Sequence, residues 1–261
     1  MNLKLIALLV LTSLSQAANV LPTTRIIDGY EVSPKFKYPW ILSLDLLGRH
    51  FCAGMAYKSN LIITAAHCTI FETEKFTASF HRHDLTLNEY VENGQRYQVI
   101  DRKAHPDYDA NKFDLNDVAI WKIDGTWGLA QKDTFVIDDG TFAKSTNQLL
   151  VTVGWGATSE GSKGSNILLE VKVPTYDTKK CVDSYKSVNK IVNDTVMFCA
   201  GYPEGAKDAC QGDSGGPIFK VEAGKTTLVG ITSWGHGCAR KNFPGIYTKL
   251  FMFKSFIEQD F

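Results

Sequence analysis

Short apolar runs separated by polar turn residues recur along most of the chain. The runs are rich in Val, Ile and Leu and are interrupted by scattered Gly and Pro, a pattern typical of β-strands joined by turns. We expect strands at residues 40–46, 61–64, 118–122, 149–153, 167–173, 217–221, 228–231 and 245–247. Many short strands with intervening turns favour a mostly β protein, built as a barrel or a sandwich, over one built on a parallel sheet.

The first residues depart from this pattern. An apolar run at residues 5–14 follows Lys4 and leads into small residues that include Ser15, Ala17 and Ala18, which is typical of a secretion signal at residues 1–17. The run is too short to span a bilayer, and we find no other segment apolar enough to anchor the chain. The alternative is a buried N-terminal helix. We expect a secreted, extracellular protein.

The last residues depart from the strand pattern in another way. Apolar side chains recur there at helical spacing, with polar residues between them, at Phe253, Phe256, Ile257 and Phe261. This stripe predicts an amphipathic C-terminal helix. Packing of the stripe on the body of the protein is favoured over a role in binding a partner.

Composition and charge narrow the class of protein. The chain has 261 residues, of which 44% are hydrophobic, so it can bury a sizeable core as one large domain or two small lobes. Its formal net charge is zero, and loss of residues 1–25 would remove Lys4 and Arg25 but no acidic residue. Nothing in this balance indicates a nucleic-acid or membrane-surface partner.

The cysteine count points to disulfides. Six cysteines follow a secretion signal, which favours bridges in an oxidising compartment over free thiols. Six cysteines allow fifteen pairings, and spacing alone does not choose among them. Because no C-x-x-C pair is present, zinc is not indicated, and a catalytic cysteine is not expected.

Three segments carry candidate chemistry. Residues 64–68 place His67 after an apolar strand, and residues 115–120 place Asp117 directly before one, where its carboxylate could be buried. The third segment, Gly-Asp-Ser-Gly-Gly-Pro, is centred on Ser214. Serine is a poor nucleophile unless a base takes its proton, and histidine serves as that base when an acceptor holds its other ring nitrogen.

The glycines around Ser214 add a further element of such a site. They let the backbone approach a substrate carbonyl closely, so the amides of Gly212 and Ser214 could stabilise an oxyanion. Chemistry of this kind needs no metal and no cofactor, and we expect neither.

With these segments, the chain resembles the trypsin and chymotrypsin family of serine peptidases. The order of histidine, aspartate and serine matches, as do residues 25–29 (Arg-Ile-Ile-Asp-Gly), 154–156 (Gly-Trp-Gly), 197–201 (Met-Phe-Cys-Ala-Gly) and 233–235 (Ser-Trp-Gly). The resemblance spans residues 26–261. It implies that His67 is the general base, Asp117 orients it, and Ser214 is the nucleophile that forms an acyl-enzyme.

The resemblance also implies a fold and a set of disulfides. The fold is all-β: two six-stranded antiparallel β-barrels with a C-terminal α-helix. The N-terminal barrel is expected at about residues 26–130, and the C-terminal barrel and helix at about residues 131–261, with a linker near residues 125–140. The family would pair Cys52 with Cys68, Cys181 with Cys199, and Cys210 with Cys238.

Specificity follows from the resemblance as well. Asp208 stands where trypsin-like members place the acid at the base of the primary pocket, and a buried carboxylate there favours cleavage after Arg or Lys. Gly235 and Gly245 match the small residues that keep this pocket open, and Ser233 and Tyr185 match positions near it. Expected partners are protein or peptide substrates with Arg or Lys at the cleavage site, and protein protease inhibitors.

Activation is implied by the first matched segment. Residues 18–25 would be an activation propeptide, and cleavage of the Arg25–Ile26 bond by an activating protease would free an amine that pairs with Asp213. The short propeptide favours a digestive or degradative role, and a monomer is expected. Two positions depart from the family pattern, Asp28 and Ala53, and neither removes a catalytic group.

Several weaker signals have simple structural interpretations. We interpret residues 81–83, His-Arg-His, as a surface loop and not a metal pair, and residues 80–95 do not match the family's acidic calcium loop. His105 is interpreted as structural, and residues 193–195 form a glycosylation sequon. Asp114 competes formally with Asp117, but only Asp117 directly precedes an apolar run.

Two other functions stay open. A catalytically silent binding protein on a protease fold would usually have lost the nucleophile or the base, whereas both are present here. An esterase of the α/β-hydrolase class also carries G-x-S-x-G, but it requires an acid and then a histidine after the serine. The only histidine after Ser214 is His236, which lies in a Gly-His-Gly-Cys turn.

Overall fold

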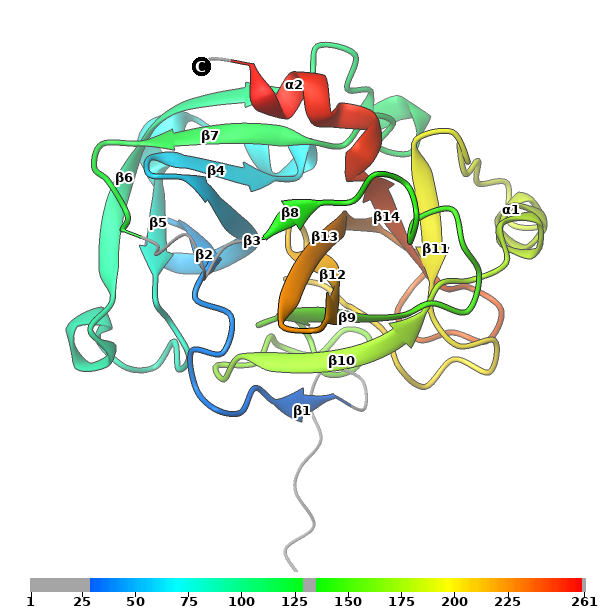
Figure 1. The fold of residues 1–261 in the computed structure, drawn as a ribbon, viewed down its shortest axis with the longest axis horizontal. Coiled ribbons are helices and arrows are strands. Elements are labelled where there is room, and N and C mark those ends of the chain that lie inside the picture. The colour runs from blue at the N-terminus through cyan, green and yellow to red at the C-terminus, as the bar shows by residue number, and fades with distance from the viewer. Residues whose placement is uncertain (1–28, 129–134, 260–261) are drawn as a thin grey trace, which may run out of the picture.

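The N-terminal half of the protein forms a closed β-barrel. The computed structural model describes residues 29–128 and 135–259. Six antiparallel strands close the barrel in the order β2-β3-β4-β7-β6-β5 (Figure 1). They are β2 (Ile41–Leu46), β3 (Arg49–Lys58), β4 (Leu61–Thr64), β5 (Phe76–Phe80), β6 (Gln95–Ala104) and β7 (Ala119–Ile123).

Large apolar side chains fill this barrel. Leu42, Leu44, Phe76 and Trp121 are completely or almost completely buried. The rings of Phe76 and Trp121 meet edge to face with centroids 4.8 Å apart, an arrangement that adds to the stability from burial. A closed barrel has no free sheet edges, so its functional residues are expected at the ends of the strands and in the loops that connect them.

The C-terminal half forms a second sheet. Its path β10-β9-β12-β13-β14-β11 consists of β9 (Leu149–Gly154), β10 (Leu169–Pro174), β11 (Met197–Ala200), β12 (Pro217–Glu222), β13 (Lys225–Trp234) and β14 (Gly245–Lys249). A bridge between Thr175 and Ala200 joins the two ends of this path. Two short strands extend the sheet: β1 (Tyr30–Glu31) pairs with β10, and β8 (Val136–Ile137) pairs with β13.

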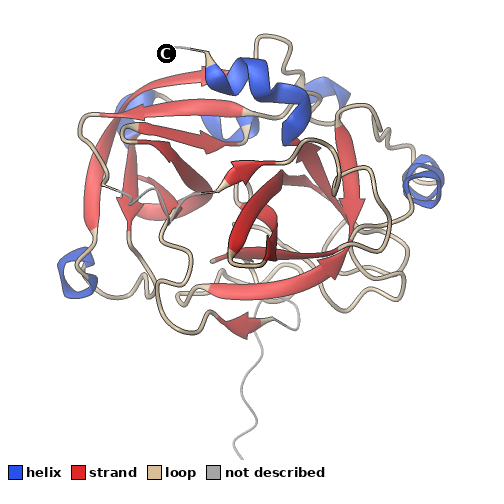
Figure 2. Ribbon diagram, in the orientation of Figure 1, coloured by secondary structure: helices blue, strands red, loops and turns tan. Residues whose placement is uncertain are grey.

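Helices are few and short among the described residues (Figure 2). The α-helices are α1 (Thr178–Lys186) and α2 (Lys254–Glu258), and the 3₁₀ turns include η1 (Ala66–Thr69), η2 (Thr73–Lys75), η3 (Glu89–Glu92), η4 (Ala110–Lys112) and η6 (Leu250–Phe253). The expected C-terminal helix is therefore split between η6 and α2. Its Phe256 and Ile257 are buried against the body of the protein, and the ring of His105 lies 4.9 Å from that of Phe256, so the packing interpretation is confirmed. Phe261 lies outside the described residues.

Each expected strand range contains a strand, but several strands were not predicted. Those missing from the prediction are the two-residue strands β1 and β8 and the longer strands β3, β5, β6 and β11. β6 carries charged and polar residues such as Arg96 and Asp101 along its length, and β3 begins with Arg49 and His50, so an apolar run does not mark either strand from end to end. Their neighbours in the barrel decide that they are strands. No helix in the described ranges is long and apolar enough to cross a membrane.

Candidate active site

His67 and Asp117 meet at the edge of the first barrel. His67 lies on η1, directly after β4, and Asp117 lies just before β7, which pairs with β4. The Nδ1 atom of His67 lies 2.8 Å from Oδ2 of Asp117, and the backbone amide of His67 donates to Oδ1 at 2.9 Å. Strand pairing thus brings together two residues that are 50 positions apart in sequence.

Asp117 is held by more than the histidine. It is 1% exposed, and the Ser233 hydroxyl donates to its Oδ2 at 2.5 Å from the second sheet. Burial acts to lower the pKa of His67, but the charges of Asp117 and Asp114 and the Asp117 hydrogen bond outweigh it, so the pKa is raised. An acceptor that holds Nδ1 in this way leaves Nε2 of His67 available to take a proton.

Ser214 is brought to the same edge by a close contact between the two halves. The amide of Ala53 on β3 donates to the Ser214 carbonyl at 2.8 Å. Gly215 follows with a φ of +77°, and a Cβ at this position would lie 2.2 Å from Oγ1 of Thr64, the last residue of β4. Only glycine fits there, so Gly215 lets the serine segment lie against the strand that leads to His67.

The loop before Ser214 is anchored on both sides of Gly212. The amide of Ala157 donates to the Gln211 carbonyl at 2.6 Å, and Nε2 of His50 lies 2.9 Å from the Gly212 carbonyl. Gly212 itself has a φ of +97°, a backbone conformation that residues other than glycine rarely adopt. These contacts fix the orientation of the peptide groups on both sides of Gly212, including the amide expected at an oxyanion.

A cavity of about 230 Å³ opens beside Ser214. Its lining includes Asp208, Ser214, Ser233, Gly235 and Gly245, so the cavity contains the predicted substrate-binding residues together with the serine. A Cβ on Gly245 would lie 2.8 Å from Oδ1 of Asp208 and would obstruct the approach to the carboxylate. The absence of a side chain there keeps the carboxylate accessible from the cavity.

Asp208 is a buried carboxylate, and only one of its two oxygens accepts a hydrogen bond from the described residues. The side chain is 3% exposed, and its Oδ2 accepts a bond from the Ala239 amide at 3.0 Å. Its Oδ1 has no hydrogen-bond partner among the described residues. Burial raises the pKa of Asp208 to about 7, against the lowering effect of the two amides that it faces, those of Ala239 and Ala209. A cation in the cavity would reverse this effect.

Asp213 is buried between the serine loop and the second sheet. It is 1% exposed and accepts bonds from the amides of Gly156 at 2.8 Å and Cys210 at 2.9 Å. Burial raises the pKa of Asp213 to about 6, although these two bonds act to lower it. Its expected partner, the amine of Ile26, lies with Arg25 outside the described residues, as do the signal segment and the propeptide.

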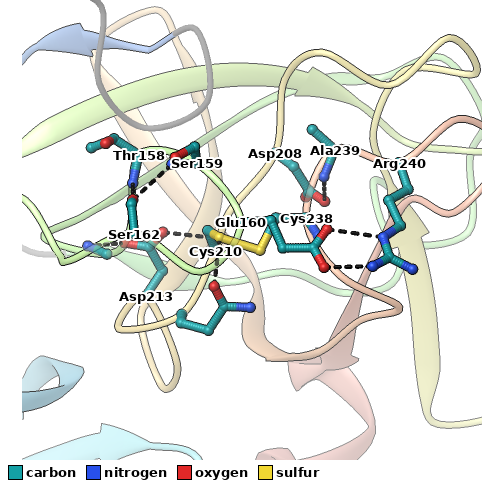
Figure 3. Close-up of a disulfide and its surroundings, with 12 residues drawn as sticks. Thr158, Ser159, Glu160, Ser162, Asp208, Cys210, Asp213, Cys238, Ala239 and Arg240 are labelled. Carbon is teal, nitrogen blue, oxygen red and sulfur yellow. Dashed lines mark hydrogen bonds and ion pairs between the residues drawn. A yellow bond between two sulfur atoms is a disulfide. The ribbon is translucent and has the colours of Figure 1, made fainter.

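Three disulfides support this region. The structure joins Cys52 to Cys68, Cys181 to Cys199, and Cys210 to Cys238, which are the pairs implied by the family resemblance. Figure 3 shows the last of these bridges between Asp213 and Asp208, with the ion pair of Glu160 and Arg240 beside it. The bridge ties the loop of Ser214 to the opposite wall of the cavity.

Among the described residues, a trio of possible metal donors does not form a metal site. Ligand atoms of Cys52, His67 and Cys68 lie within 4.8 Å of one another. Both sulfurs, however, belong to one disulfide and offer no thiolate.

The interpretation of residues 81–83 as a surface loop is wrong. His83 is completely buried and Arg82 is 3% exposed. Arg82 donates to Glu92 at 2.8 Å and to two backbone carbonyls, and His83 lies 2.8 Å from Glu31 on β1. The polar sequence misled because each polar group finds its partner within the fold, which makes burial tolerable.

The sequence did not predict the contacts that two residues, Ser233 and His50, make at the site. Ser233 was expected near the cavity, but its hydroxyl is committed to Asp117, so its side chain supports the histidine–aspartate pair. His50 was not predicted at all. It stands two residues before Cys52, and a histidine near the first bridge is the one signal that could have drawn attention to it.

Comparison with known proteins agrees with this fold. A family model described as Trypsin matches residues 26–257. The chain is 36% identical over 205 residues to Trypsin-1 of Astacus astacus, covering 77% of this chain and 84% of that protein. It is 33% identical over 242 residues to Vitellin-degrading protease of Bombyx mori, covering 90% and 85%. It is 36% identical over 239 residues to Cationic trypsin-3 of Rattus norvegicus, covering 90% and 89%.

A closed six-stranded barrel, a second β-sheet and a short C-terminal helix, together with the match to the Trypsin family model, define a class of hydrolases, the serine proteases. Within that class, this chain belongs to the trypsin family.

Proposed function

We propose that this protein is a secreted serine endopeptidase that cleaves peptide bonds after Arg or Lys. The observation that carries the proposal is Asp208, a buried carboxylate with a free oxygen in the cavity beside Ser214. A planar guanidinium or an ammonium group matches this carboxylate in charge and hydrogen bonding, and neutral side chains do not. The names of two relatives, Trypsin-1 and Cationic trypsin-3, support the same specificity.

Catalysis would follow from the arrangement of three side chains. Ser214 attacks the substrate carbonyl while Nε2 of His67 takes the hydroxyl proton, and Asp117 stabilises the imidazolium that forms. The amides of Gly212 and Ser214 stabilise the oxyanion. His67 then donates its proton to the leaving amine, and water hydrolyses the acyl-enzyme by the reverse sequence. No step requires a metal or a cofactor.

Activation is part of the proposal. Residues 1–17 direct secretion, residues 18–25 form a propeptide, and an activating protease cleaves after Arg25. The new amine of Ile26 then pairs with Asp213, whose buried carboxylate already accepts bonds from two backbone amides. Residues 26–130 and 131–261 are proposed as the two barrel domains of a monomer with a digestive or degradative role, open to inhibition by protein protease inhibitors.

The test is hydrolysis of chromogenic peptides that end in Arg, Lys, Phe or Ala. The precursor is first cleaved at Arg25, the Ile26 terminus is confirmed by sequencing, and a Ser214→Ala variant serves as control. Turnover of only the Arg and Lys peptides, absent from the control, is the expected result. Lack of turnover on every peptide would favour the silent binding protein, and preference for Phe or Ala would overturn the assigned specificity.

A further inference from the structure

A buried chain of hydrogen bonds leads from the first barrel to the serine loop. The Ser43 hydroxyl lies 2.5 Å from Oδ1 of Asp45 and 2.7 Å from Nδ1 of His50. Nε2 of His50 in turn lies 2.9 Å from the carbonyl of Gly212. Asp45 therefore connects, through Ser43 and His50, to the residue whose amide we assign to the oxyanion.

Strand geometry explains why these side chains meet. Ser43 and Asp45 are two residues apart on β2 and so point to the same face. Asp45 pairs with His50 across the β2–β3 hairpin, and Ser43 pairs with Ser79 on β5. Ser43 is completely buried and Asp45 is 5% exposed, so water cannot easily replace the contacts between them.

Counting hydrogens shows that the chain of bonds is one proton short in its ordinary state. The Gly212 carbonyl can only accept, so Nε2 of His50 must donate to it. Ser43 has one hydroxyl hydrogen but faces two acceptors, the Asp45 carboxylate and Nδ1 of a neutral His50 ring. All three bonds form together only if Asp45 or His50 carries one additional proton.

Loss of that proton disturbs the contact with Gly212. Three arrangements remain. Ser43 donates to Asp45 and its oxygen faces a bare Nδ1, or Ser43 donates to Nδ1 and its oxygen faces the Asp45 carboxylate, or His50 moves its hydrogen to Nδ1 and presents a bare Nε2 to the Gly212 carbonyl. Each arrangement places two acceptors in contact in a buried site, which is unfavourable, and movement of the His50 ring would relieve that contact. The ring then relaxes away from the serine loop or loses its bond to it.

We propose that Asp45 is a positioning residue for the oxyanion loop, and that it acts by sharing one proton with His50 through Ser43. This inference rests on the proposed function. With the proton present, His50 holds the Gly212 carbonyl and the loop is ordered for catalysis. As the proton is lost with rising pH, the hold weakens and transition-state stabilisation falls.

Other charges near the network do not replace this proton. Nε of Arg96 on β6 lies 4.0 Å from Asp45, but it donates at 3.1 Å to Ser79, whose own hydroxyl donates to Oδ2 of Asp45. Arg49 and Arg82 line the same cavity as His50 and carry no removable proton at neutral pH. Asp213, beyond Gly212, is held by the amides of Gly156 and Cys210. Burial holds the pKa of His50 below its ordinary value, although the hydrogen bond to the Gly212 carbonyl and the charge of Asp45 act to raise it.

The decisive variant is Asp45→Asn. An amide of the same shape can donate to Ser43, which then donates to Nδ1 of a neutral His50 that still donates to Gly212. The network would be complete at every pH without an additional proton. We expect the ratio of variant to wild-type kcat to rise with pH between 5 and 9, by about 3-fold to 10-fold, less than the loss of a whole oxyanion donor. The common titration of His67 cancels in this ratio.

Two controls separate the proposed path from other effects. Asp101→Asn removes the same charge from an exposed site on β6, and its ratio to wild type should stay flat with pH. In a Ser43→Ala background, Asp45→Asn should no longer change the pH profile, because the connection to His50 is missing. Affinity for benzamidine, a cation that would occupy the Asp208 cavity without contacting the oxyanion amides, should be the same in all variants, whereas affinity for a peptide aldehyde ending in Arg should follow kcat.

A direct measurement complements the kinetics. Nitrogen NMR of the wild-type His50 ring should show nitrogen shifts that change with pH as the shared proton is lost, and the Asp45→Asn protein should show a neutral ring with hydrogen on Nε2 throughout. Nitrogen shifts of the wild-type His50 ring that do not change from pH 5 to 9, or a flat kcat ratio in an active enzyme, would overturn the inference. Failure of the wild-type protein to cleave Arg peptides would instead count against the proposed function.

Discussion

Replacing Asp208 by asparagine should greatly reduce cleavage after Arg and Lys and at the same time stabilise the protein. The carboxylate is 3% exposed and has a free oxygen in the cavity, so a bound guanidinium would form a desolvated charge pair with it. Removing one partner of such a pair costs about 2–5 kcal/mol, or roughly 30-fold to 5,000-fold in kcat/KM. Turnover of Phe or Ala peptides should not fall.

The expected gain in stability follows from the pKa. Burial raises the pKa of Asp208 from 3.8 to about 7 in the folded protein. Above pH 4 the unfolded chain loses the proton more readily than the folded one, so the ionised group destabilises the fold increasingly up to about pH 7. This rise corresponds to at most about 4 kcal/mol. Asp208→Asn removes the cost, and each kcal/mol should raise the Tm by about 2–4 °C.

The assay pairs kinetics with thermal unfolding. Activated wild-type protein and Asp208→Asn are compared on Arg, Lys, Phe and Ala peptides, and their Tm values are measured at pH 4 and pH 8. The stability difference should appear at pH 8 and vanish at pH 4. Near wild-type cleavage after Arg, or a lower Tm at pH 8 for the variant, would refute the reasoning.

Three further predictions test other parts of the structure. Asp117→Asn should lower kcat by about 10⁴-fold with little change in folding, since the amide favours the wrong tautomer of His67; a loss below 10-fold in a pH–rate assay would contradict this role. Because the charge of Asp114 helps to raise the pKa of His67, Asp114→Asn should move the acidic limb of kcat/KM to lower pH; an unmoved or raised limb would show that Asp114 is too well screened to act. Phe256→Ala should destabilise the protein by about 3 kcal/mol in urea unfolding, because it empties a buried contact of α2; a loss under 1 kcal/mol would mean that α2 is not held by this side chain.

How far the fold could be predicted depended on local pattern. β4 and β9 are short apolar runs between turns, and their expected positions agree with the structure to within one residue. β6 runs from Gln95 to Ala104 with mostly polar residues and was not predicted. α1 was missed as well, because only Cys181 and Tyr185 mark its buried side. In both cases the neighbouring elements decide the local structure, and those contacts are distant in sequence.

The candidate site could also be predicted only in part from the sequence. Asp117 was preferred to Asp114 because an apolar strand follows it, and the structure places Asp117 on His67 while Asp114 accepts a bond from Tyr108. The prediction of a surface loop at residues 81–83 is wrong because it rested on polarity alone. Arg82 and His83 are buried, and they contact Glu92 and Glu31, partners that the sequence could not assign.

The sequence by itself determined what depends on residue type and short spacing: a mostly β chain, an even set of cysteines, and a serine between glycines with a histidine and an aspartate on strand ends. Only the tertiary structure decided what depends on contacts between distant segments. It brought Asp208 into a cavity with Ser214, committed Ser233 to Asp117, and connected Asp45 to Gly212 through His50. The physical reason is that burial, charge environment and hydrogen-bond partners are properties of the packed chain, and barrel closure joins residues that no local pattern relates.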